Sequence, residues 1–234
     1  GVNKWKQELT LNKSNVTSIN SVGYLTDPYY FKQNEKVLQN AKILNPDLVC
    51  LITGGIMGGP NPISNEYTSD NNIINIKGLR DETSQNIISL FEEASKLNIT
   101  LGLEPIGSWE ILKKGHFNSI ASCLKLVKDN NHKLIIDLYH SFTDADLDTF
   151  LRKSPNLGLL QFSNLSFDKN LRPTGRKTIN DLNNQNNLDL SKYIKYILNR
   201  KDKIKIEFEV FESDVNEDPK EIILNLKSEI LKLL

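Results

Sequence analysis

Hydrophobic positions along the chain alternate between two periods. Short apolar runs with a period of two, typical of strands, are separated by segments with apolar residues at i, i+3, i+4 and i+7, typical of helices. The strand candidates are 15–22, 47–55, 99–105, 133–140, 157–164 and 203–211. Two helical sets are Ile87, Ile88, Leu90, Phe91 and Ala94, and Ile120, Cys123, Leu124 and Val127. This alternation predicts an α/β fold with a parallel sheet and outer helices, either a barrel or a doubly wound sheet.

The last strand candidate, "KIKIEFEVF", has one apolar and one polar face. With side chains alternating along a strand, the apolar face holds Ile204, Ile206, Phe208 and Val210, and the other holds Lys205, Glu207, Glu209 and Phe211. The polar face belongs either to an exposed edge strand or to a strand that points acidic groups into a shared interior.

Three earlier strand candidates favour the second interpretation, in which the polar face points into a shared interior. Each of them has a polar residue able to bind a metal near its carboxyl end. These residues are Glu104, Asp137 and Gln161, and Glu209 is the fourth. The carboxyl ends of barrel strands converge on one mouth, where carboxylates repel one another unless a cation holds them. Oxygen ligands of this kind suit Mg²⁺ or Mn²⁺. We therefore expect Glu209 in an interior metal site, with Glu207 paired to Lys205 or another interior group.

A family resemblance accompanies this pattern. The chain resembles the sugar phosphate isomerase/epimerase group of the xylose isomerase-like TIM barrels, which includes ketose 3-epimerases and hydroxypyruvate isomerases. The matching segments, in chain order, are "LGLEP", "IIDLYH", "LLQFSN", a following Arg and Gly, and "IEFEVF". The resemblance implies a single TIM-barrel domain over residues 1–234. Family members have roughly one more strand–helix–strand unit before "GVNKW", so the first unit is expected to be missing here or built differently.

The resemblance also implies roles for six residues. Glu104, Asp137, Gln161 and Glu209 would hold one divalent metal, Mn²⁺ or Mg²⁺ with Co²⁺ as a further option. Glu104 and Glu209 would be the catalytic acid and base, transferring a proton through an enediolate intermediate. His140 and Arg172 would bind substrate oxygens.

Some positions depart from the family pattern. Most members have His where this chain has Gln161, and Asp where it has Asn164. The Gly-x-Gly loop after the arginine is reduced to Gly175 alone. These departures leave open a non-catalytic, ligand-binding member. A lyase or dehydratase acting on a keto-sugar or inosose is a further alternative, because it would use the same metal and acid pair.

The composition of the chain argues against some classes of binding partner. With 29 basic and 29 acidic residues, the chain lacks the basic surplus of a nucleic-acid binder. No apolar run approaches the ~20 residues that span a bilayer. Cys50 and Cys123 lie in apolar segments and are expected to be reduced core thiols. We expect a cytoplasmic protein with a small carbohydrate-like substrate and, by analogy with relatives, a homo-oligomer as an option.

Structural alternatives remain for several residues. The three acidic candidates would also suit an interior salt-bridge network with lysines such as Lys133 and Lys205. Arg172 would also suit a solvated loop, whereas His116 and His132 are expected to be ordinary loop residues. Three histidines in the whole chain are too few for the multi-zinc endonucleases of the same fold.

Overall fold

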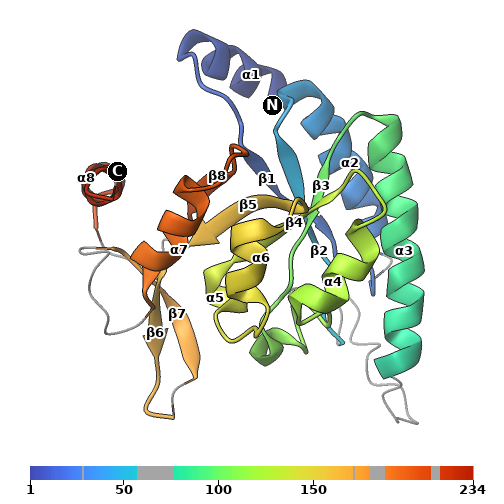
Figure 1. The fold of residues 1–234 in the computed structure, drawn as a ribbon. Helices are drawn as coiled ribbons and strands as arrows, with labels where there is room; N and C mark the ends of the chain where they lie inside the picture. Colours follow the sequence, from blue (N-terminus) through green and yellow to red (C-terminus); the bar gives the residue numbers. More distant parts are fainter. Residues whose placement is uncertain (28, 57–75, 171, 180–187, 212–216, 234) are drawn as a thin grey trace. The chain divides into compact units, whose positions relative to one another are not determined.

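The computed structural model describes residues 1–234 except 28, 57–75, 171, 180–187, 212–216 and 234 (Figure 1). The chain divides into two compact units, Gly1–Ile135 and Ile136–Leu234. The division falls inside one strand, so each unit is a set of strands and covering helices described by itself. The assignment of residues 1–234 to one domain stays a prediction.

The first unit is a run of parallel strands connected by helices. Neighbouring strands pair in chain order, and β2 pairs with β1 on one side and β3 on the other. Its elements are α1 (Val2–Leu11), β1 (Ser18–Gly23), α2 (Tyr29–Leu44), β2 (Leu48–Ile52), α3 (Ile76–Lys96), β3 (Leu101–Leu103), η1 (Ser108–Glu110), α4 (Ile120–Val127) and the start of β4 (Lys133–Asp137).

Burial in the first unit follows the predicted periods. Helix α3 buries Ile87, Leu90, Phe91 and Ala94 on one face, whereas Ile88 is exposed and does not belong to the apolar set. Strand β2 is buried along nearly its whole length. A strand buried on both faces is typical of a parallel sheet covered by helices.

The second unit holds the remaining elements. They are α5 (Leu138–Ser141), α6 (Leu147–Lys153), β5 (Leu157–Phe162), β6 (Asn164–Phe167), β7 (Pro173–Lys177), α7 (Leu190–Leu198), β8 (Lys205–Phe208) and α8 (Pro219–Leu231). Strands β5 and β8 pair in parallel, with Gln161 opposite Glu207. All six predicted strands are therefore confirmed, and the sequence pattern missed only the β6–β7 pair among the described strands.

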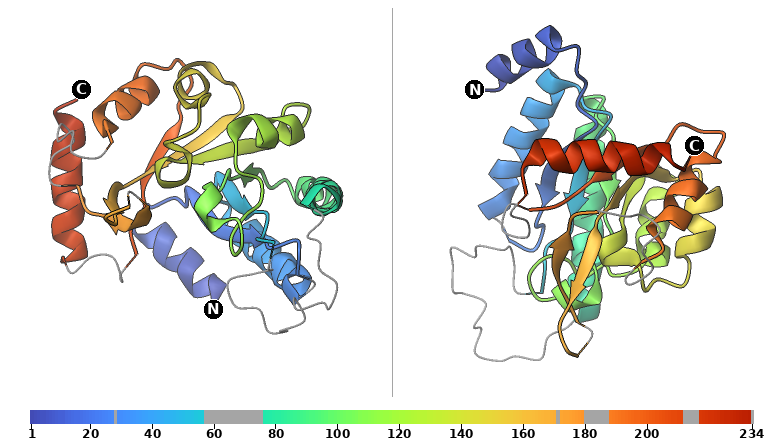
Figure 2. Two further views of the ribbon diagram at one scale, coloured as in Figure 1. Left: turned by 90° about the horizontal axis from the view of Figure 1, so that it is seen from below. Right: turned by 90° about the vertical axis from the view of Figure 1, so that its left-hand side faces the viewer.

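Strands β6 and β7 form an antiparallel pair, which Figure 2 shows side by side. It follows β5 directly, and in its register Leu165 lies opposite Arg176. Both of these residues are buried, whereas Lys177 next to Arg176 is exposed. The hairpin therefore turns one cationic side chain of β7 inward and the next one outward.

Helix α5 corrects one boundary. The strand predicted over 133–140 ends at Asp137, because its carboxylate accepts the backbone N–H of Tyr139 at 2.9 Å and caps a short helix. His140 is therefore a helical residue. By contrast, α8 begins with Pro219 after the N-cap residue Asp218, a typical helix start.

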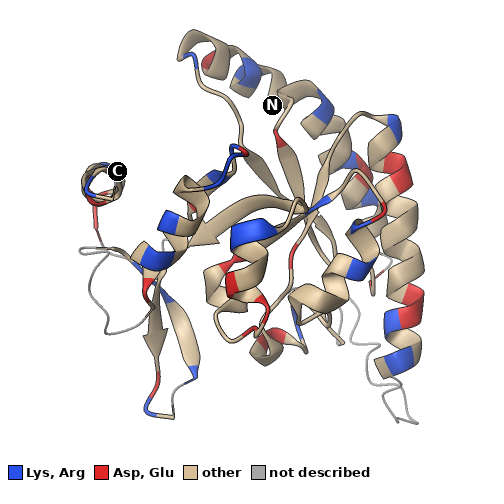
Figure 3. Cartoon of the chain, in the orientation of Figure 1, with Lys and Arg blue, Asp and Glu red and all other residues tan. Residues whose placement is uncertain are grey.

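Basic and acidic residues are interspersed over the described part of the chain, as Figure 3 shows. This distribution agrees with the neutral overall charge of the sequence. Within the described residues, no helix is long and apolar enough to cross a membrane.

Candidate functional site

In the first unit, Glu104 directly follows β3 and is buried. Its backbone N–H donates to the carbonyl of Leu51 in β2 at 3.0 Å, which continues the parallel ladder by one residue. The thiol of Cys50 donates to its Oε2 at 3.2 Å. Glu104 therefore lies at the carboxyl end of its strand, as predicted, and Cys50 is a buried, unoxidised cysteine.

Tyr24 is a neighbour of this carboxylate that the sequence reasoning missed. It follows the last residue of β1, and its N–H donates to the carbonyl of Ile52 at 2.8 Å. Burial is the main cause that raises the pKa of Tyr24 to about 12, and the negative charges of nearby groups, including Glu104, add to it. The phenol thus stays protonated and is able to donate a hydrogen bond. Its position just after a strand is the signal that would have found it.

In the second unit, Asp137 is fully buried at the end of β4. Its Oδ1 accepts the Tyr139 N–H, and its Oδ2 pairs with Nη2 of Arg176. Burial raises the pKa of this carboxyl to about 6, against the opposing effect of the Arg176 charge; Glu209 raises it further. Asp137 is therefore a carboxylate whose ionised form depends on a cation beside it.

The polar faces of β5 and β8 lie together. The Nε2 amide of Gln161 donates to Oε2 of Glu207 at 3.1 Å, and Glu209 continues the ladder by donating its N–H to the Phe162 carbonyl at 3.1 Å. Gln161 is buried and the two glutamates are half-buried. The polar face of "KIKIEFEVF" therefore meets another strand rather than solvent alone. Gln161 is the interior group that pairs with Glu207.

Arg176 is the cation of this unit's acidic cluster. Its Nη2 pairs with Asp137 Oδ2 and with Glu209 Oε2, the latter at 3.1 Å. Its guanidinium carbon lies 4.2 Å from the ring centre of Tyr139 and 5.0 Å from that of Phe211. The interior ion pairs foreseen as the structural alternative thus exist for Asp137 and Glu209, but with an arginine instead of a lysine.

The two arginines of the hairpin region have different environments. Arg172 is exposed, and its backbone N–H donates to Oδ1 of Asp168 at 2.9 Å. Arg176 is 4 % exposed and contacts two predicted site residues. The substrate-binding role of Arg172 stays a prediction. Spacing alone did not separate the two arginines, because the hairpin register decides which one turns inward.

His140 is buried in α5, with its Nε2 4.0 Å from Oδ2 of Asp137. Its ring meets that of Tyr139 edge to face, with the ring centres 4.9 Å apart. The structure thus brings His140, Asp137, Gln161, Glu209 and Arg176 into the second unit's interior.

Three buried polar atoms of the same unit have no hydrogen-bond partner among the described residues. They are Oε1 of Gln161, Oγ of Ser163 and Oγ of Ser141. Buried polar atoms are nearly always satisfied, so each such atom in a folded protein requires an explanation. These three lie at or just beyond the ends of β5 and β4, where ligands of parallel α/β folds bind.

The other two histidines are not ordinary loop residues, because both are buried. Nδ1 of His116 lies 2.6 Å from the Gly54 carbonyl. Nδ1 of His132 accepts the Leu101 N–H at 2.9 Å, and its Nε2 contacts the Phe91 carbonyl at 3.1 Å. Burial lowers the pKa of both imidazoles. These neutral rings join the strands and helices of the first unit.

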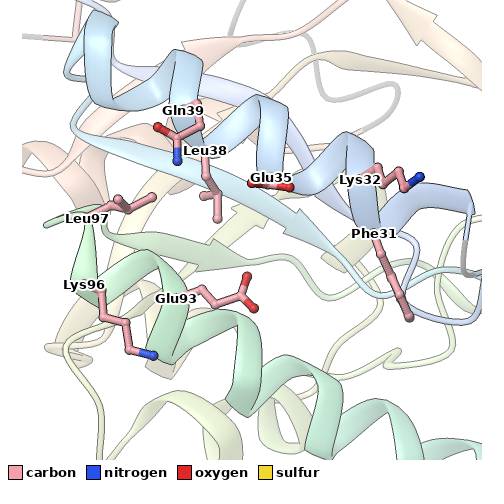
Figure 4. A pocket seen from close by; sticks show the side chains of 8 residues that line it. All are labelled: Phe31, Lys32, Glu35, Leu38, Gln39, Glu93, Lys96 and Leu97. Atoms are coloured by element: carbon pink, nitrogen blue, oxygen red, sulfur yellow. The ribbon is translucent and has the colours of Figure 1, made fainter.

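One described pocket lies between two helices, away from these strand ends. It has a volume of about 440 Å³ between α2 and α3 and is lined by Phe31, Lys32, Glu35, Leu38, Gln39, Glu93, Lys96 and Leu97 (Figure 4). Its charged side chains are balanced in sign and come from the outer faces of two helices. This composition is that of an ordinary groove between helices.

No family model matches the chain, and no curated protein matches it significantly. Solved structures do match. The chain is similar to a 3-keto-D-glucoside 4-epimerase from E. coli, with 16% identity, a TM-score of 0.69, and coverage of 99% of this chain and 84% of that one. It is also similar to a xylose isomerase domain containing protein from Salmonella typhimurium LT2, with 14% identity, a TM-score of 0.65, and coverage of 99% and 80%.

A D-psicose 3-epimerase from Clostridium cellulolyticum H10, solved with D-tagatose, matches with 14% identity and a TM-score of 0.65, over 99% of this chain and 82% of that one. At such low sequence identity, these structural matches show the fold alone. That fold agrees with the parallel strands and covering helices described above. The chain has the xylose isomerase-like TIM-barrel fold, which is shared by several sugar isomerases and epimerases.

Proposed function

We propose that the chain is a divalent-metal-dependent isomerase or epimerase of a small sugar, ketose or hydroxy-ketone. The observation that carries this proposal is the amide of Gln161. Because Glu207 accepts from its Nε2, the orientation of the amide is fixed and its Oε1 is left buried without a partner among the described residues. A carbonyl oxygen left over in this way fits a hard cation such as Mn²⁺ or Mg²⁺.

The other proposed ligands also present oxygen. Asp137 and Glu209 reach the same cation, Arg176, so their carboxylates are close enough to share a charge. Glu104 ends β3, the strand that pairs with β4 through Leu103 and Leu134. In this fold the strand ends converge on one mouth. The proposed donor set is therefore Asp137, Gln161, Glu209 and Glu104, whose oxygen atoms would suit one divalent metal.

The protein residues would carry the proton. A bound metal would polarise a carbonyl and a neighbouring hydroxyl, which makes the adjacent C–H more acidic. One of Glu104 and Glu209 would remove that proton and the other would return one, to the opposite face in an epimerisation or to the neighbouring carbon in an isomerisation. Donors such as His140, Tyr24 and Arg172 would bind substrate oxygens. The named similar proteins act on keto-sugars and ketoses, which supports a substrate of that class.

Metal binding is the first test. Titration of the purified protein with Mn²⁺ in a calorimeter is expected to show about one metal per chain. Glu209→Gln should abolish or strongly weaken this binding, whereas Glu221→Gln, an exposed carboxylate of α8, should leave it unchanged. Full epimerase or isomerase activity in the Glu209→Gln variant would overturn the acid–base role.

Two alternative functions predict different results in the metal-binding and activity experiments. A lyase or dehydratase would bind metal equally well but release water from a keto-sugar, which a product screen by mass detects. A non-catalytic member would bind no metal and turn over no ketose. The ion pairs of Arg176 with Asp137 and Glu209 are the specific observation that favours the latter.

A further inference from the structure

We propose that Arg176 is an internal counter-ion that competes with the divalent cation for Asp137 and Glu209, so that metal binds only when the β6–β7 hairpin withdraws the guanidinium. This inference rests on the proposed function, and it adds a control of metal loading that is specific to this chain. It concerns residues of the second unit alone.

The two carboxylate oxygens of Asp137 have different partners. Its Oδ1 accepts the Tyr139 N–H that caps α5, so this oxygen is committed to the backbone. The remaining oxygen, Oδ2, is the one that a metal would take, and it is also the one that pairs with Arg176. One oxygen that faces a guanidinium nitrogen at hydrogen-bond distance has no room for a metal on the same side, and the two positive charges repel.

Glu209 shares the cation with Asp137, because Arg176 reaches both carboxylates with the same nitrogen. Nη2 contacts Oδ2 of Asp137 and lies 3.1 Å from Oε2 of Glu209. A single cationic atom bridging two carboxylates has the role that a metal ion has in a carboxylate site. It satisfies charge that burial would otherwise make costly, so the metal-free protein is stabilised by its own arginine.

The aromatic rings around Arg176 hold the guanidinium in this position. Its central carbon lies over the ring of Tyr139 at 4.2 Å and over that of Phe211 at 5.0 Å. Such cation–π contacts attract the guanidinium to the ring faces, and the attraction is stronger where water is excluded. Two ion pairs and two ring contacts therefore hold Arg176 beside the carboxylates, and a metal has to displace it from all of them.

Movement of the β6–β7 hairpin is able to withdraw the Arg176 guanidinium from the carboxylates. Arg176 comes from β7, which among the described strands pairs only with β6, in a two-stranded sheet separate from the parallel strands. Two-stranded hairpins are marginally stable by themselves. Displacing Arg176 thus costs its own contacts and a shift of one hairpin, and it leaves β4, β5 and β8 in place.

The test compares Arg176→Gln with Arg172→Gln, an exposed arginine of the same region. Mn²⁺ titration calorimetry is expected to show binding at least about tenfold tighter in Arg176→Gln than in the intact protein, which corresponds to about 1.4 kcal/mol. Without metal, Arg176→Gln should unfold at a lower temperature, and Mn²⁺ should restore it. Arg172→Gln should change neither quantity.

The outcomes separate this inference from the proposed function. Unchanged or weaker Mn²⁺ binding in Arg176→Gln, with normal binding by the intact protein, overturns the competition alone. Absence of Mn²⁺ binding in both proteins overturns both proposals and makes Arg176 a permanent structural cation. If Arg176→Gln does not fold without metal, Arg176→Met is the second variant. It removes the charge and keeps an apolar stem of similar length, and a Mn²⁺ affinity no higher than that of the intact protein overturns the competition.

Discussion

Two buried polar side chains, His132 of the first unit and Asp137 of the second, have opposite environments. In the first unit, His132 is neutral, and both of its ring nitrogens have partners on α3 or β3. In the second unit, Asp137 is balanced by Arg176 while Gln161 and two serines keep polar atoms without partners among the described residues. A buried group with all its bonds made is typical of structure, whereas unsatisfied atoms beside a balanced charge indicate a place for a ligand.

The largest expected effect is at Asp137. In the metal-free protein, Asp137→Asn should lose about 3 kcal/mol of unfolding free energy, because the buried Arg176 then keeps only the half-buried Glu209 as a partner in these ion pairs. Urea unfolding in the presence of a chelator measures this loss. Asp129→Asn, at an exposed site of the first unit, is the control with an expected loss of less than about 0.5 kcal/mol. A similarly small loss for Asp137→Asn would contradict the comparison.

A smaller effect, with a characteristic pH dependence, is expected at His132. His132→Gln should lose about 2 kcal/mol at neutral pH, because the Leu101 N–H loses its buried acceptor. Burial lowers the pKa of this imidazole from its ordinary value of 6.5. The unfolded chain therefore takes up the proton first as the pH falls, so the stabilisation by His132 is present above 6.5 and decreases below it.

Urea unfolding of both proteins between neutral pH and about pH 5 tests this dependence. The difference in unfolding free energy between the intact protein and His132→Gln should narrow as the pH falls. A difference that stays constant or widens would show that the imidazole is not held neutral. The raised pKa of Asp137 makes the folded protein more stable as the pH falls, which is opposite to the effect of His132. Because both proteins contain Asp137, this contribution cancels when they are compared at the same pH.

The smallest effect is expected for an exposed ion pair of the second unit. Nζ of Lys192 lies 2.8 Å from Oδ2 of Asp148, and both side chains are more than a third exposed. Lys192→Met keeps most of the aliphatic stem and should cost no more than about 0.5 kcal/mol. High salt should reduce this cost further in thermal unfolding. A loss close to that of Asp137→Asn would mean that burial does not separate the two pairs.

The fold was predictable from the sequence because its strands and helices are long enough to show their periods. The carboxyl-end positions of Glu104, Asp137, Gln161 and Glu209 were predictable for the same reason, since a strand fixes where its side chains lie. The β6–β7 pair was missed because β7, "PTGRK", contains Pro and Gly and no alternating apolar residues, and because β6 follows β5 with no turn signal between them. The metal-binding and catalytic roles of the predicted residues stay predictions.

Arg176 and the buried histidines were missed for another reason. Nothing within "RPTGRK" distinguishes an inward from an outward arginine, because the distinction arises from pairing with β6. Likewise, His132 lies in a polar stretch between α4 and β4, and its burial depends on α3, which is distant in sequence. Long-range packing of this kind leaves no local pattern in one sequence.

The register of the hairpin has a consequence for how such a protein diversifies. Because side chains alternate across a strand, adding or removing one residue between Phe167 and Pro173 would exchange the inward face of β7. Gly175 and Lys177 would then point inward in place of Arg176. A single insertion or deletion outside the barrel strands would thus exchange the planar guanidinium that bridges two carboxylates for a flexible ammonium group in one evolutionary step. The length of this connection therefore decides which kind of cation faces the interior carboxylates.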